Sequence, residues 1–263
     1  MHYYKTIIQY EGTKYAGFQW QNGIATVQSE FNTALSSLIS GKTTTMAASR
    51  TDTGVHAHMQ VVKISSENQI NTSAFLKSFN ELLPREIRCL SIEICDGLFR
   101  PAAESLSKEY RYFFTNKTKV SKEETQFVAN IANKLDIEAM RTCILALTGD
   151  HDFCNFYSSG SNVKTTIRKV FSCELTLVNP KDILPVDGLF QIPEELNECY
   201  QFKIEASGFL KQMIRHLISS LWMVGSGKLS TADFIQLLDG PKNDKHLWKV
   251  ASANGLFLYK INY

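Results

Sequence analysis

The chain has 263 residues, enough for one large domain or two ordinary ones, and its 44% hydrophobic content is that of a soluble globular protein. A formal net charge of only +2 excludes a broadly basic chain, so a nucleic-acid surface would need local clustering of basic residues. The most apolar segment, residues 209–224, contains Lys211, Arg215 and His216, which excludes a membrane span. The first residues do not form a signal peptide, and a cytoplasmic protein is expected.

The first part of the chain alternates strands and helices. Thr26 is placed to cap a helix whose apolar residues recur at helical spacing, and Pro84 must follow the end of a second helix. In chain order we predict a strand over 3–10, a glycine loop over 11–17, a helix over 26–41, a strand over 59–64, a helix beginning at 71 and a strand over 87–94.

The second part has a similar rhythm. We predict a strand over 110–114, a helix over 136–147, loops over 149–153 and 158–161, strands over 167–178 and 200–206, a long helix over 209–224, a short helix over 231–238 and a final strand over 255–261. The acidic, proline-containing segment 179–198 is predicted to be a surface loop. The pattern predicts an α+β protein with two similar halves.

The six cysteines show no C-x-x-C pair and no regular framework. This usage argues against a metal cluster and for reduced, partly buried thiols in a cytosolic protein.

The stretch 47–57 contains several residues whose side chains could take part in catalysis or binding. Arg50 and Asp52 stand two apart, so on an extended backbone they point to the same face, and Gly54 permits a turn that other residues disfavour. A carboxylate beside a guanidinium stays ionised. On these residues alone, a surface turn with a local ion pair and a functional carboxylate both remain open.

Two other interpretations of this stretch fit less well. Asp52-Thr53-Gly54 is also the tripeptide of aspartic proteases, but those enzymes need two carboxylates that share a proton, and the chain has one such tripeptide. His56 and His58 are two apart and could face a metal, but no third ligand lies at a suitable spacing. We therefore expect neither a protease nor a metal site.

Two residues in the second half have alternative interpretations. Tyr110, between Lys108 and Arg111 on an expected strand, is either a core residue or a platform on which a base stacks. Arg215 lies in an apolar helical segment with Lys211 on the same face, and is either solvated or a partly buried charge that needs a carboxylate. Their spacing alone does not decide between these.

Taken together, these motifs resemble the tRNA pseudouridine synthase A family. The matching blocks are Y-E-G-T-K-Y-A-G-F-Q at 10–19, T-V-Q at 26–28, R-T-D-T-G-V-H-A at 50–57, N-x-x-L-P at 80–84, K-E-Y-R-Y at 108–112, D-H-D-F at 150–153, F-L-K-Q-M-I-R at 209–215 and A-N-G-L at 253–256. The sequence departs from the family pattern at Ser49 and Ser219, where glycine is usual, at Thr53, where alanine is usual, and in the block 99–102, where F-H-A-R is replaced by F-R-P-A.

The resemblance implies a fold and an activity. The fold would be α+β, with two half-domains over 1–105 and 106–263, mainly antiparallel sheets joined side by side, helices on one face and an active-site cleft between the halves. The activity would be isomerisation of uridine to pseudouridine in the anticodon stem-loop of tRNA, at positions 38, 39 and 40. It would need no cofactor and no metal, and the partners would be tRNA and a second copy of the chain in a homodimer.

The resemblance also assigns roles. Asp52 would act at the ribose, Arg50 would help to flip the nucleotide, Tyr110 would stack on the uracil and Arg215 would pair with Asp52. Further RNA contacts would come from Phe99, Arg100, Lys108, Arg111, Lys164, Arg168 and Lys169. The rival interpretation is a non-catalytic RNA-binding protein on the same fold, which would need none of Asp52, Tyr110 and Arg215.

Overall fold

The computed structural model of the protein describes residues 1–160, 163–184, 189–243 and 248–263. Its strands are β1 (His2–Tyr10), β2 (Thr43–Ala47), β3 (His56–Ser66), β4 (Ile87–Ile94), β5 (Ser107–Thr115), β6 (Ala129–Asn130), β7 (Gly149–Asp152), β8 (Ile167–Val178), β9 (Cys199–Ala206) and β10 (Leu256–Asn262). Its helices are α1 (Val27–Leu38), α2 (Thr72–Leu82), α3 (Ile137–Leu145), α4 (Met213–Gly225), α5 (Thr231–Leu237) and the short 3₁₀ helix η1 (Pro180–Asp182). Within these ranges no helix is both long and apolar enough to cross a membrane.

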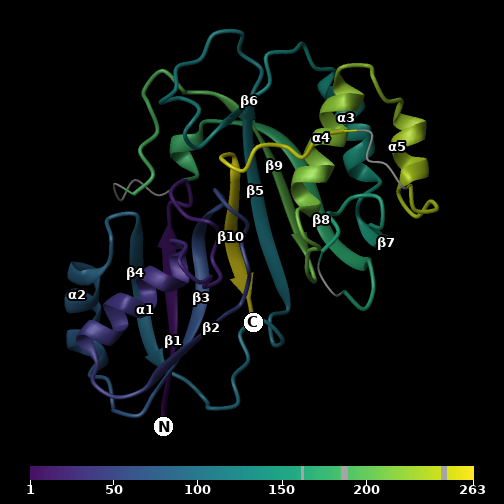
Figure 1. The fold of residues 1–263 in the computed structure, drawn as a ribbon. Helices are drawn as coiled ribbons and strands as arrows, with labels where there is room; N and C mark the ends of the chain where they lie inside the picture. The colour runs from purple at the N-terminus through teal and green to yellow at the C-terminus, as the bar shows by residue number, and fades with distance from the viewer. Residues whose placement is uncertain (161–162, 185–188, 244–247) are drawn as a thin grey trace. The chain divides into compact units, whose positions relative to one another are not determined.

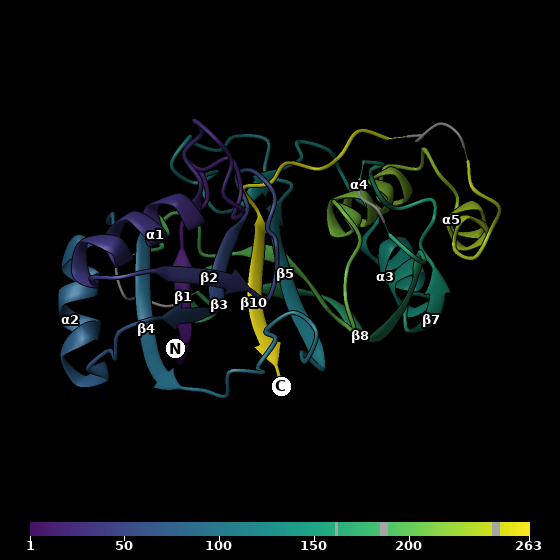
Figure 2. The ribbon, with the colours of Figure 1, turned by 60° about the horizontal axis from the view of Figure 1, so that its bottom comes forward.

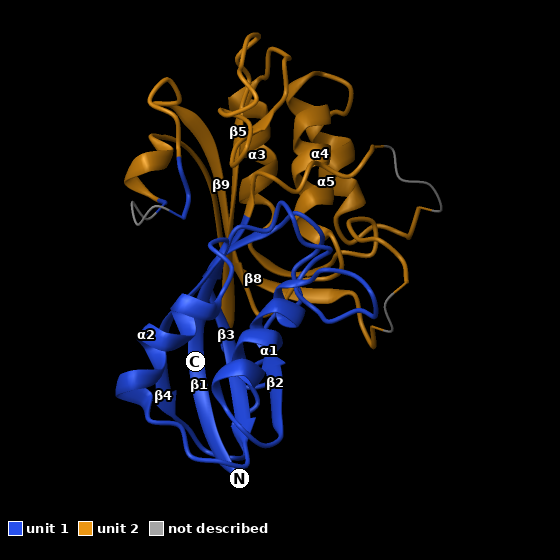
Figure 3. Ribbon diagram, turned by 60° about the vertical axis from the view of Figure 1, so that its left-hand side comes forward, with its two compact units in different colours: residues 1–106, 184–191, 257–263 blue, residues 107–183, 192–256 orange. Residues whose placement is uncertain are grey.

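The chain divides into two compact units, coloured separately in Figure 3. Unit 1 contains residues 1–106, 184–191 and 257–263, and unit 2 contains residues 107–183 and 192–256. The predicted α+β class with mainly antiparallel pairing is confirmed. A division into folding domains after residue 105 stays a prediction, since the compact units are not consecutive segments of the chain.

The sheet of unit 1 has the order β4-β1-β3-β10. β1 pairs antiparallel with both β3 and β4, whereas β10 runs parallel to β3 and pairs Phe257 with His56. β2 joins the far end of β3, where Thr43 faces Ser66. We did not predict β2, because its threonine-rich sequence lacks an apolar alternation. β3 begins at His56, directly after the loop 48–55 that carries Arg50 and Asp52.

Helices α1 and α2 lie side by side against the sheet of unit 1 (Figures 1 and 2). The predicted cap at Thr26 is confirmed: its hydroxyl accepts from the N–H of Ser29 at 3.1 Å, and the Ser29 hydroxyl accepts from the N–H of Thr26 at 2.9 Å. Such caps contribute about 1 kcal/mol. The rings of Phe31 and Phe79 meet edge to face at 4.9 Å, which joins the two helices through their buried sides.

The sheet of unit 2 has the antiparallel order β5-β9-β8-β7, and α3 lies beside α4 (Figure 2). Alternate side chains of β5 point to opposite faces. Tyr112 and Phe114 are buried on the face that carries Trp222 of α4, with ring centroids 6.0 Å and 5.7 Å from the indole. Tyr110 belongs to the same face by alternation.

Two loop predictions were wrong. Residues 149–152 form β7, an edge strand whose polar sequence is held by pairing with β8 rather than by apolar alternation. The segment 179–198 is not simply a surface loop, because Leu184, Phe190 and Leu196 are buried. Phe190 packs edge to face on Phe257 of β10 at 5.3 Å.

The long helix begins later than predicted, at Met213 instead of 209. Gln212 has φ 58°, a left-handed conformation that a helix cannot contain. Apolar residues at 209 and 210 continue the helical pattern in sequence, but they pack from an irregular backbone.

Candidate functional site

The R-T-D motif lies on the loop that joins β2 to β3 in unit 1. Burial alternates along it: Arg50 is exposed, Thr51 is buried and Asp52 is half-buried. The main-chain oxygen of Asp52 accepts from the N–H of Val55 at 3.1 Å, closing a turn in which Gly54 has φ 77°. The loop therefore presents the two charged side chains while Thr51 anchors it.

Side chains from the strands hold this loop. The Gln60 amide donates to the carbonyl of Ser49 at 2.7 Å and accepts from its N–H at 3.2 Å. The Tyr10 hydroxyl lies 2.7 Å from the Thr51 hydroxyl in the core. Ser49 is not among the positive-φ residues of the described chain, so its backbone does not require the glycine that is usual in the family.

The glycine loop 11–17 packs directly on the motif loop. The N–H of Gly12 donates to Nδ1 of His56 at 3.0 Å, and a Cβ on Gly12 would lie 2.0 Å from the carbonyl oxygen of Val55. Gly17 has φ 90°, and a Cβ there would lie 2.7 Å from the carbonyl oxygen of Thr51. The two sequence blocks thus form one structure, in which missing side chains allow backbone-to-backbone contact.

Tyr110 lies in unit 2 on β5. It is buried, with 7% of its surface exposed, and its ring meets Phe209 edge to face at 5.0 Å. Phe209 belongs to the segment that immediately precedes α4. The structure thus places Tyr110 against the beginning of the F-L-K-Q-M-I-R block.

Arg215 lies on the first turn of α4 and is half-buried. Its Nε donates to the carbonyl of Ala251 at 2.6 Å, and its own carbonyl accepts from the N–H of Ala251 at 3.3 Å. Burial raises the pKa of the nearby Tyr112 hydroxyl, and the positive charge of Arg215 opposes this increase. The guanidinium is oriented by main chain, while its pairing with Asp52 stays a prediction.

The candidate RNA contacts differ in their surroundings. Arg100, Lys164 and Lys169 are exposed. Burial lowers the pKa of Lys108 and of Arg168.

Two of the candidates are held by neighbouring groups. Phe99 packs against Tyr263 with ring centroids 5.3 Å apart. Arg111 donates from Nε to Glu109 at 2.7 Å, and alternation along β5 places it on the face opposite Tyr110.

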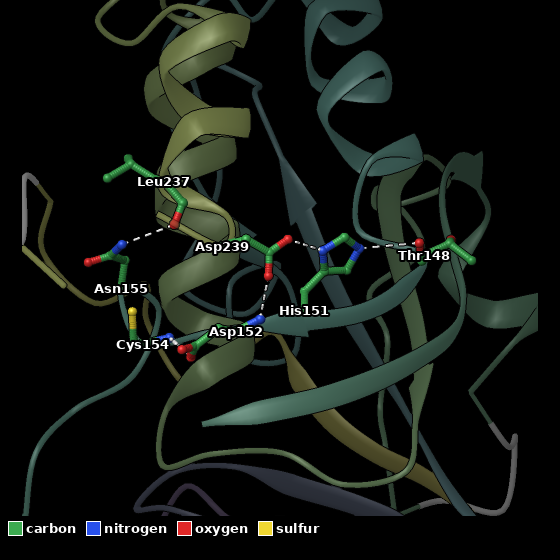
Figure 4. A network of polar contacts seen from close by, with 7 residues as sticks. All are labelled: Thr148, His151, Asp152, Cys154, Asn155, Leu237 and Asp239. Atoms are coloured by element: carbon green, nitrogen blue, oxygen red, sulfur yellow. Dashed lines mark hydrogen bonds and ion pairs between the residues drawn. The ribbon is translucent and has the colours of Figure 1, made fainter. Parts of the chain in front are cut away.

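The D-H-D-F block lies beside the end of α5 (Figure 4). Nδ1 of His151 lies 2.6 Å from one carboxylate oxygen of Asp239, whose other oxygen accepts from the N–H of Asp152 at 2.6 Å. Asp239 has φ 63°, a conformation that aspartate and asparagine tolerate better than most residues. Asn155 adds a hydrogen bond to the carbonyl of Leu237 at 3.0 Å. The block fastens the end of α5 to β7.

We expect Asp239→Asn to lower stability at neutral pH more than at acidic pH. Burial raises the pKa of Asp239, but hydrogen bonds from His151 and Asp152 outweigh it, so the folded-state pKa lies below the ordinary value. The ionised carboxylate therefore stabilises the fold at pH values above the unfolded-state pKa. This contribution disappears as the pH falls through the folded-state pKa. Because the side chain is 51% exposed, the loss should not exceed about 1 kcal/mol.

Urea unfolding of wild type and Asp239→Asn at pH 7 and pH 3 measures this difference. Asparagine keeps the backbone preference. Like a protonated aspartic acid, it carries no charge and replaces one acceptor oxygen with a donor. An equal difference at both pH values would contradict the assignment.

The H-x-H pair does not converge on a common ligand. The His56 ring stacks on Phe257 at 4.7 Å, and the His58 ring lies against Tyr259 at 4.7 Å. Among the described residues, no three histidine, cysteine or acidic side chains form a metal-binding group.

Sequence reasoning missed Gln60, which holds Ser49, and it missed Ser158, His216 and Trp248, which are hydrogen-bonded to one another at the start of α4. His216 follows Arg215 directly, which is the one local signal that could have identified it. The side-chain hydrogen bonds of Gln60 reach partners 11 and 50 positions away, and those of the other three residues reach partners 32 to 58 positions away.

Comparisons with known proteins cover nearly all of the chain. A family model described as tRNA pseudouridine synthase matches residues 144–263. The tRNA pseudouridine synthase A of Geobacter sp. (strain M21) is 34% identical over 261 residues, which cover 98% of each chain. That of Listeria monocytogenes serotype 4b (strain CLIP80459) is 31% identical over 99% of this chain and 98% of its own, and that of Acetivibrio thermocellus is 31% identical over 98% of each.

Among solved structures, a Cbf5–Nop10–Gar1 complex aligns with 83% of this chain and 44% of its own at 13% identity. Its TM-score of 0.33 is too low to inform the fold. The full-length sequence relatives decide the assignment, and the chain belongs to the tRNA pseudouridine synthase A family.

Proposed function

We propose that this protein isomerises uridine to pseudouridine in tRNA, within the anticodon stem-loop at positions 38, 39 and 40. The observation that carries the proposal is the 34% identity over 98% of a tRNA pseudouridine synthase A, together with the R-T-D motif on a loop built to present Asp52. An RNA-binding protein without catalysis has no need for that carboxylate.

The reaction breaks the bond between N1 of uracil and C1′ of ribose, and forms a bond between C5 and the same carbon. The proton leaves C5, and N1 ends with one, so no atom is gained or lost overall. The conversion is redox-neutral and needs no cofactor for its balance. It needs a carboxylate at the ribose, a pocket that retains the detached uracil and a group that accepts the C5 proton.

Asp52 is the carboxylate in this proposal. An aspartate is ionised in its ordinary state at neutral pH, so it requires positioning rather than activation. Both attack on C1′ and removal of a ribose proton use the ionised form. The buried Thr51 and Ser49, whose backbone makes two hydrogen bonds to the Gln60 side chain, support such positioning. They fix the backbone on the N-terminal side of Asp52.

The remaining roles follow from charge and shape. A paired uridine must leave the stack, at a cost of a few kcal/mol, and the exposed Arg50 would take its place in the helix. Tyr110 would stack on the flipped uracil and assist loss of the C5 proton. Arg215 would pair with Asp52 through two parallel N–H donors, a geometry that lysine cannot copy. A homodimer that shares one tRNA is part of the proposal.

The test is to incubate the purified protein with a tRNA transcript that carries uridine at positions 38, 39 and 40. We expect pseudouridine at one or more of these positions and unchanged uridine elsewhere, as read by mass spectrometry of fragments. A tRNA with cytidine at all three positions is the matched control. Absence of product, or product only outside the stem-loop, would overturn the proposal.

A further inference from the structure

A directed chain of hydrogen bonds lies at the start of α4, one residue from Arg215. The indole N–H of Trp248 donates to Nδ1 of His216 at 3.2 Å, and Nε2 of His216 lies 2.9 Å from the hydroxyl of Ser158. That hydroxyl donates to the side-chain carbonyl of Gln212. His216 is buried, with 1% of its surface exposed.

The hydrogen-bond partners determine which atom carries each proton in this network. An indole N–H can only donate, so Nδ1 of His216 must be unprotonated. The neutral imidazole then carries its proton on Nε2 and donates it to Ser158, which leaves the hydroxyl proton for Gln212. The histidine is therefore held in a single tautomer by partners on both sides.

The chain ends on a strained residue. Gln212 has φ 58°, and no side-chain cap closes the helix there. Backbone strain of this kind persists only where surrounding contacts hold it. Its side chain is fastened by Ser158, whose N–H also donates to the carbonyl of Lys211 at 3.0 Å. The contacts that hold Gln212 thus set where α4 begins.

Residues 248–252, which we call the anchor segment, connect this chain to Arg215. Trp248 begins the segment, Ala251 exchanges two hydrogen bonds with Arg215, and the carbonyl of Ser252 accepts from the Tyr112 hydroxyl at 2.9 Å. The Trp248 indole also stacks on Phe156 at 5.7 Å. A shift of Trp248 would therefore move the carbonyl that orients the guanidinium.

We propose that Trp248 and His216 are positioning residues, which fix the guanidinium of Arg215 through the anchor segment and the first turn of α4. The inference rests on the proposed function for the role of Arg215, and adds residues that contact neither substrate nor reacting atoms. They act on turnover because a guanidinium displaced by a fraction of an ångström no longer matches a carboxylate.

The first test is Trp248→Phe, which removes the indole N–H and keeps an aromatic ring on Phe156. We expect kcat to fall about tenfold, with KM for tRNA within about twofold, because positioning affects the reacting geometry more than binding. Trp222→Phe is the matched control on α4, since its indole N–H is buried with no hydrogen-bond partner among the described residues. Ser158→Ala provides a second variant if Trp248→Phe fails to fold, and should also lower kcat.

A double-mutant cycle separates positioning from general damage. In an Arg215→Lys background the side chain lacks Nε, so adding Trp248→Phe should change kcat by less than about twofold. An equal loss in both backgrounds, or an unchanged kcat in Trp248→Phe alone, would overturn the inference.

Nitrogen-15 NMR of labelled histidine gives a readout that is independent of activity. We expect His216 in the neutral Nε2–H form in wild type and Trp222→Phe, and altered shifts of both ring nitrogens in Trp248→Phe. A wild-type signal from the Nδ1–H form would overturn the inference even if the protein makes pseudouridine. If the wild-type protein shows the expected tautomer but makes no pseudouridine, the proposed function is wrong and the hydrogen-bond assignment is not.

Discussion

Replacing Asp52 with asparagine should abolish pseudouridine formation while the protein remains folded. Asparagine has the same shape but carries no charge, so it can neither attack a sugar carbon nor remove a proton at neutral pH. We expect turnover to fall by at least about a thousandfold, the scale on which enzymes lose an essential side chain. The amount of pseudouridine formed within the tRNA transcript, followed over hours by mass spectrometry, measures the loss.

The loop itself should survive this change. The turn at Asp52 is closed by its main-chain oxygen, and the anchors at Ser49 and Thr51 involve other side chains. Thermal unfolding and tRNA binding should therefore stay close to those of wild type. Turnover by Asp52→Asn above about a tenth of the wild-type rate would exclude the carboxylate mechanism.

Replacing Gly12 with alanine should destabilise unit 1 and reduce activity together. The new Cβ would lie 2.0 Å from the carbonyl oxygen of Val55 and 3.1 Å from the carbonyl carbon of Gly54, so one of the two loops must move. Backbone cannot rotate away as a side-chain tip can, and overpacking of this kind costs about 3 kcal/mol or more. Movement would also lengthen the hydrogen bond from Gly12 to His56.

Gly208→Ala is the matched control, since its added Cβ would meet only the Arg168 side chain, at 3.9 Å. Urea unfolding should separate the two variants by at least about 2 kcal/mol. Comparable stability of the two variants would contradict the close approach of the two loops.

Much of the fold could be predicted where local chemistry decides it. Thr26 and Asn71 cap their helices with their own side chains, and α2 ends at Leu82, two residues before Pro84. The strand predicted over 167–178 is confirmed, since β8 runs from Ile167 to Val178. These signals depend on residues within one or two turns of each other, which is the range that sequence patterns report.

Elements stabilised by distant partners could not be predicted in this way. β7 has a polar sequence and exists because β8 pairs with it. The apolar pattern at residues 209 and 210 continues that of α4, yet the strained Gln212 separates the two, and that strain is supported by Ser158, 54 positions earlier.

The candidate site divides along the same line. Arg50 and Asp52 stand together in one motif, and we identified them from it. The residues that support Arg215 do not stand in one motif. Ser158 lies 58 positions before His216, and Trp248 lies 32 positions after it. Only the fold brings these three side chains together.

The interleaving of the two units has a consequence for synthesis on the ribosome. β3, which begins one residue after the motif turn, has β10 as a parallel neighbour, and the His56 ring stacks on Phe257 of that strand. Residues 257–263 are translated after all of unit 2. The nascent first 106 residues therefore cannot complete their sheet before residues 257–263 have been synthesised. We expect the loop that carries Asp52 to reach its final form only after the last strand has left the exit tunnel.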